Sequence, residues 1–215
     1  MQRSPSQQHA FTLIEMITVI AIIAILSGLV LTIAGSVQRK GYQTRAETDV
    51  RTMAAGCEAY KTDNGGYPQD NQSTGASVTN DIDPRIDTSP SSPKYAVSTQ
   101  YLYRQLSGDE NANGRIEGAE LNRKYISDFF KPSRFDAAYK NTGNVTYIMD
   151  PFGYSYGYST AGLKSEQDYR VDLEKDASSP RPATVKGYNP TFDLWSTAGA
   201  TGSTDADKAK WIKNW

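Results

Sequence analysis

The chain has 215 residues, a formal net charge of −1, one Cys and one His. The near-neutral charge gives no electrostatic support for a nucleic-acid partner, and the lone Cys57 cannot form an intramolecular disulfide. His9 precedes a long apolar run and no histidine follows it, which excludes His-dependent nucleophilic catalysis and His-ligated zinc in the rest of the chain. We therefore expect no enzyme and assign no catalytic residues.

The first predicted element is an apolar helix over residues 11–34, FTLIEMITVIAIIAILSGLVLTIA. Nineteen consecutive residues from Met16 to Ala34 carry no charge, which is long enough to cross a bilayer. The Ile, Leu, Val and Phe side chains favour insertion by about 4 to 8 kcal/mol. Two interpretations give Glu15 no role: a plain membrane anchor, or a secretory signal peptide cut after Ala34.

A third interpretation explains the carboxylate of Glu15. A cut between Ala10 and Phe11 creates a new α-amine at Phe11, one helical turn before Glu15. A charge in lipid is tolerated when it is paired, and in a bundle of parallel helices Glu15 can meet the amine of a neighbouring chain. Such pairing fixes the axial stagger between subunits, so this interpretation predicts that Glu15 specifies assembly.

The sequence QQHA followed by FTLIE and a long apolar helix resembles the type IV pilin-like superfamily, which includes type IV pilins and type II secretion pseudopilins. The resemblance implies a leader that a prepilin peptidase removes after Ala10, and N-methylation of the new terminus at Phe11. The family usually has Gly before the cut, where this chain has Ala10.

An amphipathic stem helix is predicted over residues 35–66. Its apolar side chains recur at spacings of four and three residues and form one helix face; they are Ala46, Val50, Met53, Cys57 and Tyr60. The sequence TDNGGYP ends this helix, because Asn and Gly favour a C-cap and Pro68 blocks continuation. Residues 67–98 are rich in Ser, Thr, Asp and Pro, so we expect a long polar surface loop without chemistry.

A calcium-type loop is predicted at residues 109–120, DENANGRIEGAE, inside a helical insertion over 99–144. The loop matches the EF-hand pattern at every specified position, with Gly114 at the sharp turn. The expected Ca²⁺ ligands are Asp109, Asn111, Asn113, the Arg115 carbonyl, Glu117 and Glu120. Helices are expected before the loop over 98–106 and after it over 119–130. The alternative is an ordinary Asn- and Gly-rich turn beside a helix.

The C-terminal region, residues 145–215, is predicted to be a small sheet. VTYIMD reads as a strand, Asp150-Pro151 as a turn, and the alternating Tyr154, Tyr156 and Tyr158 as a second strand. GYNPTFDLWSTAG supplies a further strand before the terminal WIKNW. The DPFG, FDLWS and NW sequences resemble the head of the major pseudopilin of type II secretion.

That resemblance also implies a calcium-binding last loop, but this chain departs from the pattern there. Thr201 replaces the first acid and Lys210 lies near the second position, while Asp205 and Asp207 stand in a shifted register. We therefore do not carry this second calcium site over.

The expected fold class is α+β, with a long N-terminal helix, half transmembrane and half amphipathic, packed on a small antiparallel sheet with an inserted EF-hand-like loop. The expected parts are a prepilin leader (1–10), a transmembrane helix segment (11–34), the stem helix (35–66), the polar loop (67–98), the helical insertion (99–144) and the sheet region (145–215).

The resemblance implies a structural subunit, a pseudopilin that polymerises into a periplasmic rod and drives type II protein secretion. The implied location is the bacterial inner membrane, with a single pass and the head in the periplasm. Implied partners are further copies of the chain, minor pseudopilins, a prepilin peptidase, an inner-membrane platform, a secretion ATPase and an outer-membrane secretin. The alternatives are a type IV pilin subunit, or a membrane-tethered calcium- or ligand-binding module.

Overall fold

The computed structural model describes residues 12–71, 78–118, 120, 124–182 and 185–215. The expected leader at 1–10, and with it Ala10, lies outside the described residues, as does Phe11. Two compact units divide the chain, Met1–Gly41 and Tyr42–Trp215.

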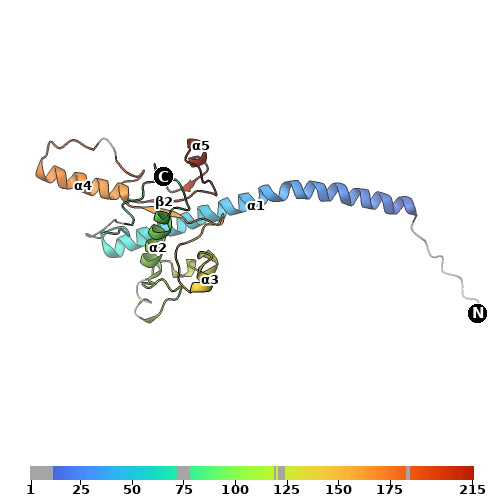
Figure 1. The fold of residues 1–215 in the computed structure, drawn as a ribbon, viewed down its shortest axis with the longest axis horizontal. Coiled ribbons are helices and arrows are strands. Elements are labelled where there is room, and N and C mark those ends of the chain that lie inside the picture. The colour runs from blue at the N-terminus through green and yellow to red at the C-terminus, as the bar shows by residue number, and fades with distance from the viewer. Residues whose placement is uncertain (1–11, 72–77, 119, 121–123, 183–184) are drawn as a thin grey trace, which may run out of the picture. The chain divides into compact units, whose positions relative to one another are not determined.

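Helix α1 runs from Leu13 to Asn64 and contains 52 residues (Figure 1). It begins in the first unit and continues into the second, as the sequence predicts for the long N-terminal helix. In the residues that the structure describes, no helix is both long and apolar enough to cross a membrane.

In the second unit, the predicted apolar face of α1 packs into the core. Val50, Met53 and Cys57 are buried, and they share one cluster with residues of helix α2, Pro93–Ser107, and of the sheet. Tyr60 at the end of this face is half-buried and packs against the same cluster. The predicted spacing thus identified the side of the helix that the head covers.

Helix α2 begins earlier than expected, at Pro93 rather than near Ser98. The Ser92 side chain accepts a hydrogen bond from the Lys94 backbone N–H, and Pro93 occupies the first turn, where its missing N–H costs nothing. Gly108 closes the helix in the left-handed conformation.

The sheet has three short antiparallel strands in the order β1-β2-β3. They are β1 (Gly157–Ser159), β2 (Asp193–Ser196) and β3 (Ile212–Lys213). In the register, Tyr158 lies opposite Leu194 and Ser196 lies opposite Ile212. The small antiparallel sheet is confirmed.

The strand expected over 145–150 is wrong. This stretch has only two isolated bridges, Phe135 to Ile148 and Met149 to Ser155. The Asp136 carboxylate accepts a hydrogen bond from the backbone N–H of Thr146 at 2.8 Å, so a side chain and not a neighbouring strand satisfies this donor.

The insertion contains short helices: 3₁₀ segments η2 (Ser127–Phe129) and η3 (Pro132–Arg134), and helix α3 (Tyr139–Thr142). The continuous helix expected over 119–130 is wrong across the described residues 124–130. The N–H groups of Tyr125 and Ile126 both donate to the carbonyl of Leu106, at 2.9 and 3.3 Å, so they cannot form helical hydrogen bonds. Residues 119 and 121–123 lie outside the described residues.

Two further helices follow β1 in the chain: α4 (Ala161–Lys175) and the short α5 (Asp205–Lys208). Only Ala161 and Gly162 of α4 are buried, and Figure 1 shows α4 projecting from the second unit. The pairs Lys164–Asp168 and Glu166–Arg170 connect successive turns of α4, which supports a helix that has little packing of its own.

Candidate functional site

The first described residues of the chain form a capping box around Glu15. The Glu15 Oε2 atom accepts hydrogen bonds from the backbone N–H of Thr12 at 2.8 Å and from its hydroxyl at 2.7 Å. The Glu15 N–H donates in turn to the Thr12 hydroxyl at 3.3 Å. This reciprocal arrangement satisfies donors at the start of α1 and holds the carboxylate against Thr12.

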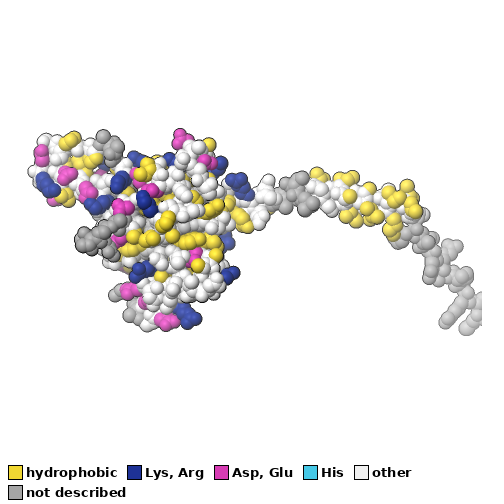
Figure 2. All heavy atoms as spheres, in the orientation of Figure 1, with side chains coloured by type: hydrophobic (Ala, Val, Ile, Leu, Met, Phe, Trp, Pro, Cys, Tyr) yellow, Lys and Arg dark blue, Asp and Glu magenta, His cyan; other side chains and the backbone are white. Residues whose placement is uncertain are grey.

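The first unit exposes a large apolar surface along α1 (Figure 2). The exposed side chains include Leu13, Ile14, Ile17, Ile20, Ile25 and Leu26. Contiguous apolar surface of this extent marks an interface with another protein or with lipid. The structure therefore places an acidic residue at the start of an apolar helix surface that lacks a partner in the single chain.

In the predicted calcium loop, the side-chain oxygens accept hydrogen bonds from backbone N–H groups of the same loop. Asp109 is buried, and its Oδ2 atom accepts from the Gly114 N–H at 2.7 Å and from the Tyr103 hydroxyl. Asn111 and Asn113 accept backbone N–H groups two residues further on, from Asn113 and Arg115 respectively. Gly114 has φ +75°, and a Cβ atom there would lie 2.4 Å from the Tyr139 hydroxyl.

Glu120 closes the loop from its other end. Its Oε1 accepts from the Glu110 N–H at 3.1 Å and its Oε2 from the Glu117 N–H at 3.0 Å. Across the described ranges, no three acidic, His or Cys residues are grouped as a metal ion would require. The loop therefore has oxygen donors of the right kind, but its carboxylates are bonded to amides, and the EF-hand-like loop is not confirmed.

The last loop of the chain is closed by side chains that include a lysine. Asp207 accepts from the Thr204 hydroxyl at 2.7 Å, and Lys210 Nζ lies 3.1 Å from Asp207 Oδ1. Lys208 Nζ donates to the Arg85 carbonyl at 2.8 Å. Here the Lys210 ammonium contacts Asp207, an acid of the loop where the family resemblance implied a metal, so these residues do not fit calcium.

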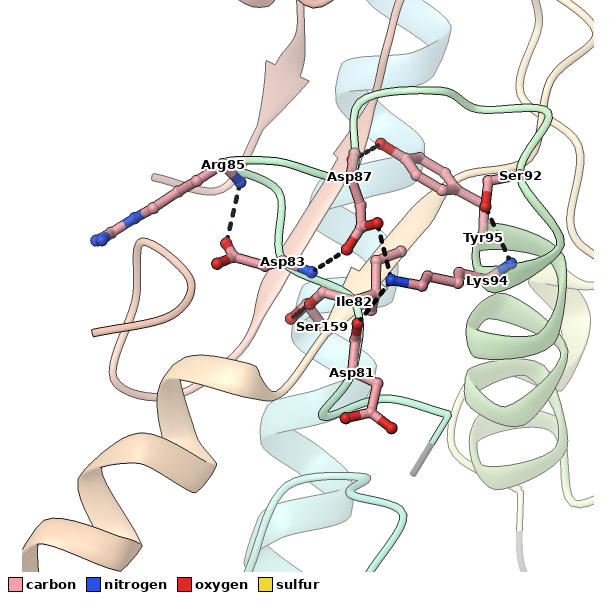
Figure 3. A network of polar contacts seen from close by, with 9 residues as sticks. All are labelled: Asp81, Ile82, Asp83, Arg85, Asp87, Ser92, Lys94, Tyr95 and Ser159. Carbon is pink, nitrogen blue, oxygen red and sulfur yellow. Dashed lines mark hydrogen bonds and ion pairs between the residues drawn. The ribbon is translucent and has the colours of Figure 1, made fainter. Parts of the chain in front are cut away.

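The predicted polar loop is irregular over residues 78–92, as expected, but several of its side chains are buried and not on the surface. Asp83 donates its N–H to Asp87 Oδ2 at 2.9 Å, and Lys94 Nζ contacts both Asp87 Oδ1 and the Asp81 carbonyl (Figure 3). Ile82 is fully buried and shares an apolar cluster with Tyr95 and Trp195. The segment is ordered because its own carboxylates accept hydrogen bonds from its backbone N–H groups. Its low hydrophobicity gave no indication of this order.

Sequence reasoning also missed a pair of buried carboxylates at a tight turn. Asp193 accepts the N–H groups of Tyr188 at 2.8 Å and Asn189 at 2.9 Å, while Asp83 accepts that of Gly187 at 3.1 Å. Three consecutive amides thus bind two acids. Burial raises the pKa of Asp193 to about 6, against the lowering effect of the hydrogen bonds.

Comparison with known proteins first defines a class. The prokaryotic N-terminal methylation motif matches residues 5–31, which include the predicted cut, Glu15 and much of the apolar helix. With the long helix and small antiparallel sheet, this motif makes the chain similar to proteins of the pilin-like class. No solved structure matches the chain.

The chain is also similar to the type II secretion system core protein G of two bacteria. It is 40% identical to that of Pseudomonas aeruginosa over 72 residues, 34% of this chain and 51% of the relative. It is 30% identical to that of Dickeya chrysanthemi over 98 residues, 46% of this chain and 60% of the relative. The chain thus spans less than two thirds of the length of either relative, and it resembles core protein G as the sequence motifs predict.

Proposed function

We propose that this protein is a pseudopilin, a structural subunit that polymerises into a rod of a type II secretion system. One observation carries the proposal: the methylation motif at 5–31 coincides with a capped Glu15 and an unpartnered apolar helix surface. An acid next to a freshly created α-amine, on a helix that must bury its apolar surface, suits assembly of parallel helices.

The proposal includes the processing steps and partners that the family resemblance implies. A prepilin peptidase cuts after Ala10 and Phe11 is N-methylated. The subunit is held in the bacterial inner membrane with its head in the periplasm, and it joins further copies and minor pseudopilins. An inner-membrane platform, a secretion ATPase and an outer-membrane secretin complete the apparatus. The subunit itself performs no catalysis.

Two measurements on cells that express the full chain with its secretion genes test this function. Mass spectrometry is expected to find a mature N-terminus at methylated Phe11, and electron microscopy is expected to show rods that antibodies against the chain decorate. A chain that keeps residues 1–10 and forms no rods contradicts the proposal. An uncut chain without rods is what a membrane-tethered binding module predicts. Surface pili that extend beyond the cell would instead favour a type IV pilin.

We also propose that the loop at 109–120 binds one Ca²⁺ ion in a structural role. The full match to the EF-hand pattern and the closure of the loop by Glu120 support this proposal. The oxygens of Asp109, Asn111, Asn113, Glu117 and Glu120, with the Arg115 carbonyl, would hold the ion.

Thermal unfolding with calcium and with chelator tests this site. Because a ligand that binds only the folded state stabilises it, calcium is expected to raise Tm by several degrees, ~4 °C for each 1 kcal/mol. Glu120→Gln is expected to abolish the difference, and Glu174→Gln on α4 serves as the matched control. Equal Tm values in calcium and chelator for the unaltered chain contradict the proposal.

A further inference from the structure

Helix α4 forms an arm whose described contacts with other parts of the chain lie mainly along its first half, where Gln167 bonds to Gln69 and Glu166 pairs with Arg181. Beyond Ala161 and Gly162 none of its residues is buried, and Val171, 47% exposed, stands among charged neighbours. Residues 172–176 contain three acids and one lysine, so the tip of the arm is acidic. A projecting helix with an exposed apolar residue and an acidic tip is suited to docking into a complementary groove.

A groove of matching character lies between α1 and β3. We call it the stem groove; its volume is about 580 Å³. Val50, Ala54 and Ile212 supply apolar lining. Two cations, Arg51 and Lys213, line it together with one acid, Glu47, so the groove has an excess of positive charge.

The arm is not placed to fill the groove of its own chain. Leu163, Gln167 and Arg170 of α4 line a different cavity with Asn64 at the end of α1. Between Val50 in the stem groove and Asn64, α1 rises by about 21 Å. The tip of α4 also projects away from the remainder of the second unit in Figure 1. The two surfaces therefore suit different copies of the chain.

We propose that the arm of one copy docks in the stem groove of a second copy. The contact places Val171 against the apolar lining, and Asp172 and Glu174 near Arg51 and Lys213. It joins different patches on the two copies, and such a heterologous contact repeats into an open helical polymer when it does not close a ring. The inference rests on the proposed polymer. It adds a contact between the second units of two copies, which the N-terminal helix does not provide.

Cysteine cross-linking of the full chain tests the contact. Asp172→Cys and Lys213→Cys are expressed together as separate copies with the secretion genes, while the buried Cys57 stays in place. The mixture is expected to give a disulfide-linked dimer that neither variant gives alone. Lys140→Cys on α3, also exposed, replaces Lys213→Cys as the matched control and is expected to give none.

Charge reversal provides a second readout. Asp172→Lys with Glu174→Lys is expected to lower rod yield about tenfold, as is Arg51→Glu with Lys213→Glu, and the combination is expected to restore it. The control pair Lys131→Glu and Lys140→Glu, exposed in the insertion, is expected to leave the yield unchanged.

The outcomes separate this contact from the proposed function. Rods from the unaltered chain, without a cross-link above the control or without restoration by the combined reversal, overturn the docking contact and leave the pseudopilin function standing. Absence of rods from the unaltered chain overturns both.

Discussion

Asp49 connects three parts of the second unit through one carboxylate. Its Oδ2 atom accepts from the Tyr156 hydroxyl at 2.9 Å and pairs with the guanidinium of Arg134. Arg134 in turn lies over the ring of Phe129, 4.1 Å from its centroid. The carboxylate is 1% exposed, so its charge depends on these partners.

Replacing Arg134 by Met is expected to lower the free energy of unfolding by about 3 kcal/mol, because a buried carboxylate loses its counter-charge. Urea unfolding measures the change. In the double variant Asp49→Asn with Arg134→Met, the loss is expected to be smaller than the sum of the two single losses. Additive losses would show that the two side chains do not interact.

Asp193 is expected to make stability depend on pH. Its pKa, raised to about 6 by burial, exceeds the value of 3.8 for the free side chain. The native state therefore binds this proton more tightly, and the stabilisation is complete below about pH 4 and is lost as pH rises through 6. Asp83 nearby raises the pKa further, whereas Arg85 lowers it.

Unfolding free energies at pH 4.5 and 7.5 check this expectation. Asp193→Asn is expected to remove about 2 kcal/mol of the pH-dependent difference, although it weakens the turn at both pH values. Asp81 is an exposed acid two residues before Asp83, and Asp81→Asn is expected to leave the pH-dependent difference unchanged. A pH profile that is the same in Asp193→Asn as in the parent contradicts the assignment.

At the scale of elements, Gly162 fixes the root of α4. A Cβ atom at this position would lie 2.0 Å from the carbonyl oxygen of Asn189, a backbone atom that cannot swing away. Gly162→Ala is expected to cost about 1 to 3 kcal/mol of unfolding free energy and to speed proteolysis of the arm. Gly66→Ala, with nothing within 4 Å of its Cβ, is the control. Equal proteolysis of the two variants would contradict a tight root.

The elements that the sequence predicts are those with a strong period or a clear cap. The face of α1 from Ala46 to Cys57 repeats at helical spacing and is buried as predicted. Helix α4 was missed because its sequence, AGLKSEQDYRVDLEK, has few apolar residues, and ion pairs between turns support it instead. The observed strands are shorter than expected because side chains accept hydrogen bonds from backbone N–H groups that a β-ladder would use. Asp150, for example, accepts the N–H of Tyr154.

The sequence indicated the part of the candidate site whose residues are close together in the chain, around Glu15. The motif FTLIE singled out Glu15, whose capping contacts lie within one helical turn, and it predicts a cut after Ala10, a residue outside the described part of the chain. The groupings of Asp49 with Arg134 and of Asp83 with Asp193 join residues 85 or more positions apart in the chain, and no spacing rule reports them.

For the whole molecule, assembly is expected to depend on one acid. Glu15→Leu is expected to lower rod yield by at least about tenfold, because the mature α-amine of a neighbour then lacks its partner in an apolar environment. Electron microscopy and the yield of sheared rods measure this. Asp63→Leu, which removes the same charge from the exposed end of α1, serves as control, and rods as abundant in Glu15→Leu as in the parent would refute the assembly role.

Cys57 has a practical consequence for experiments on the entire protein. Its side chain is fully buried in the core, and burial raises the pKa of the thiol. The thiolate that reacts with maleimides and oxidants is therefore scarce and out of reach at neutral pH. Fluorophores can be attached to single surface cysteines of the otherwise native chain, so the growth of individual polymers can be followed by light microscopy.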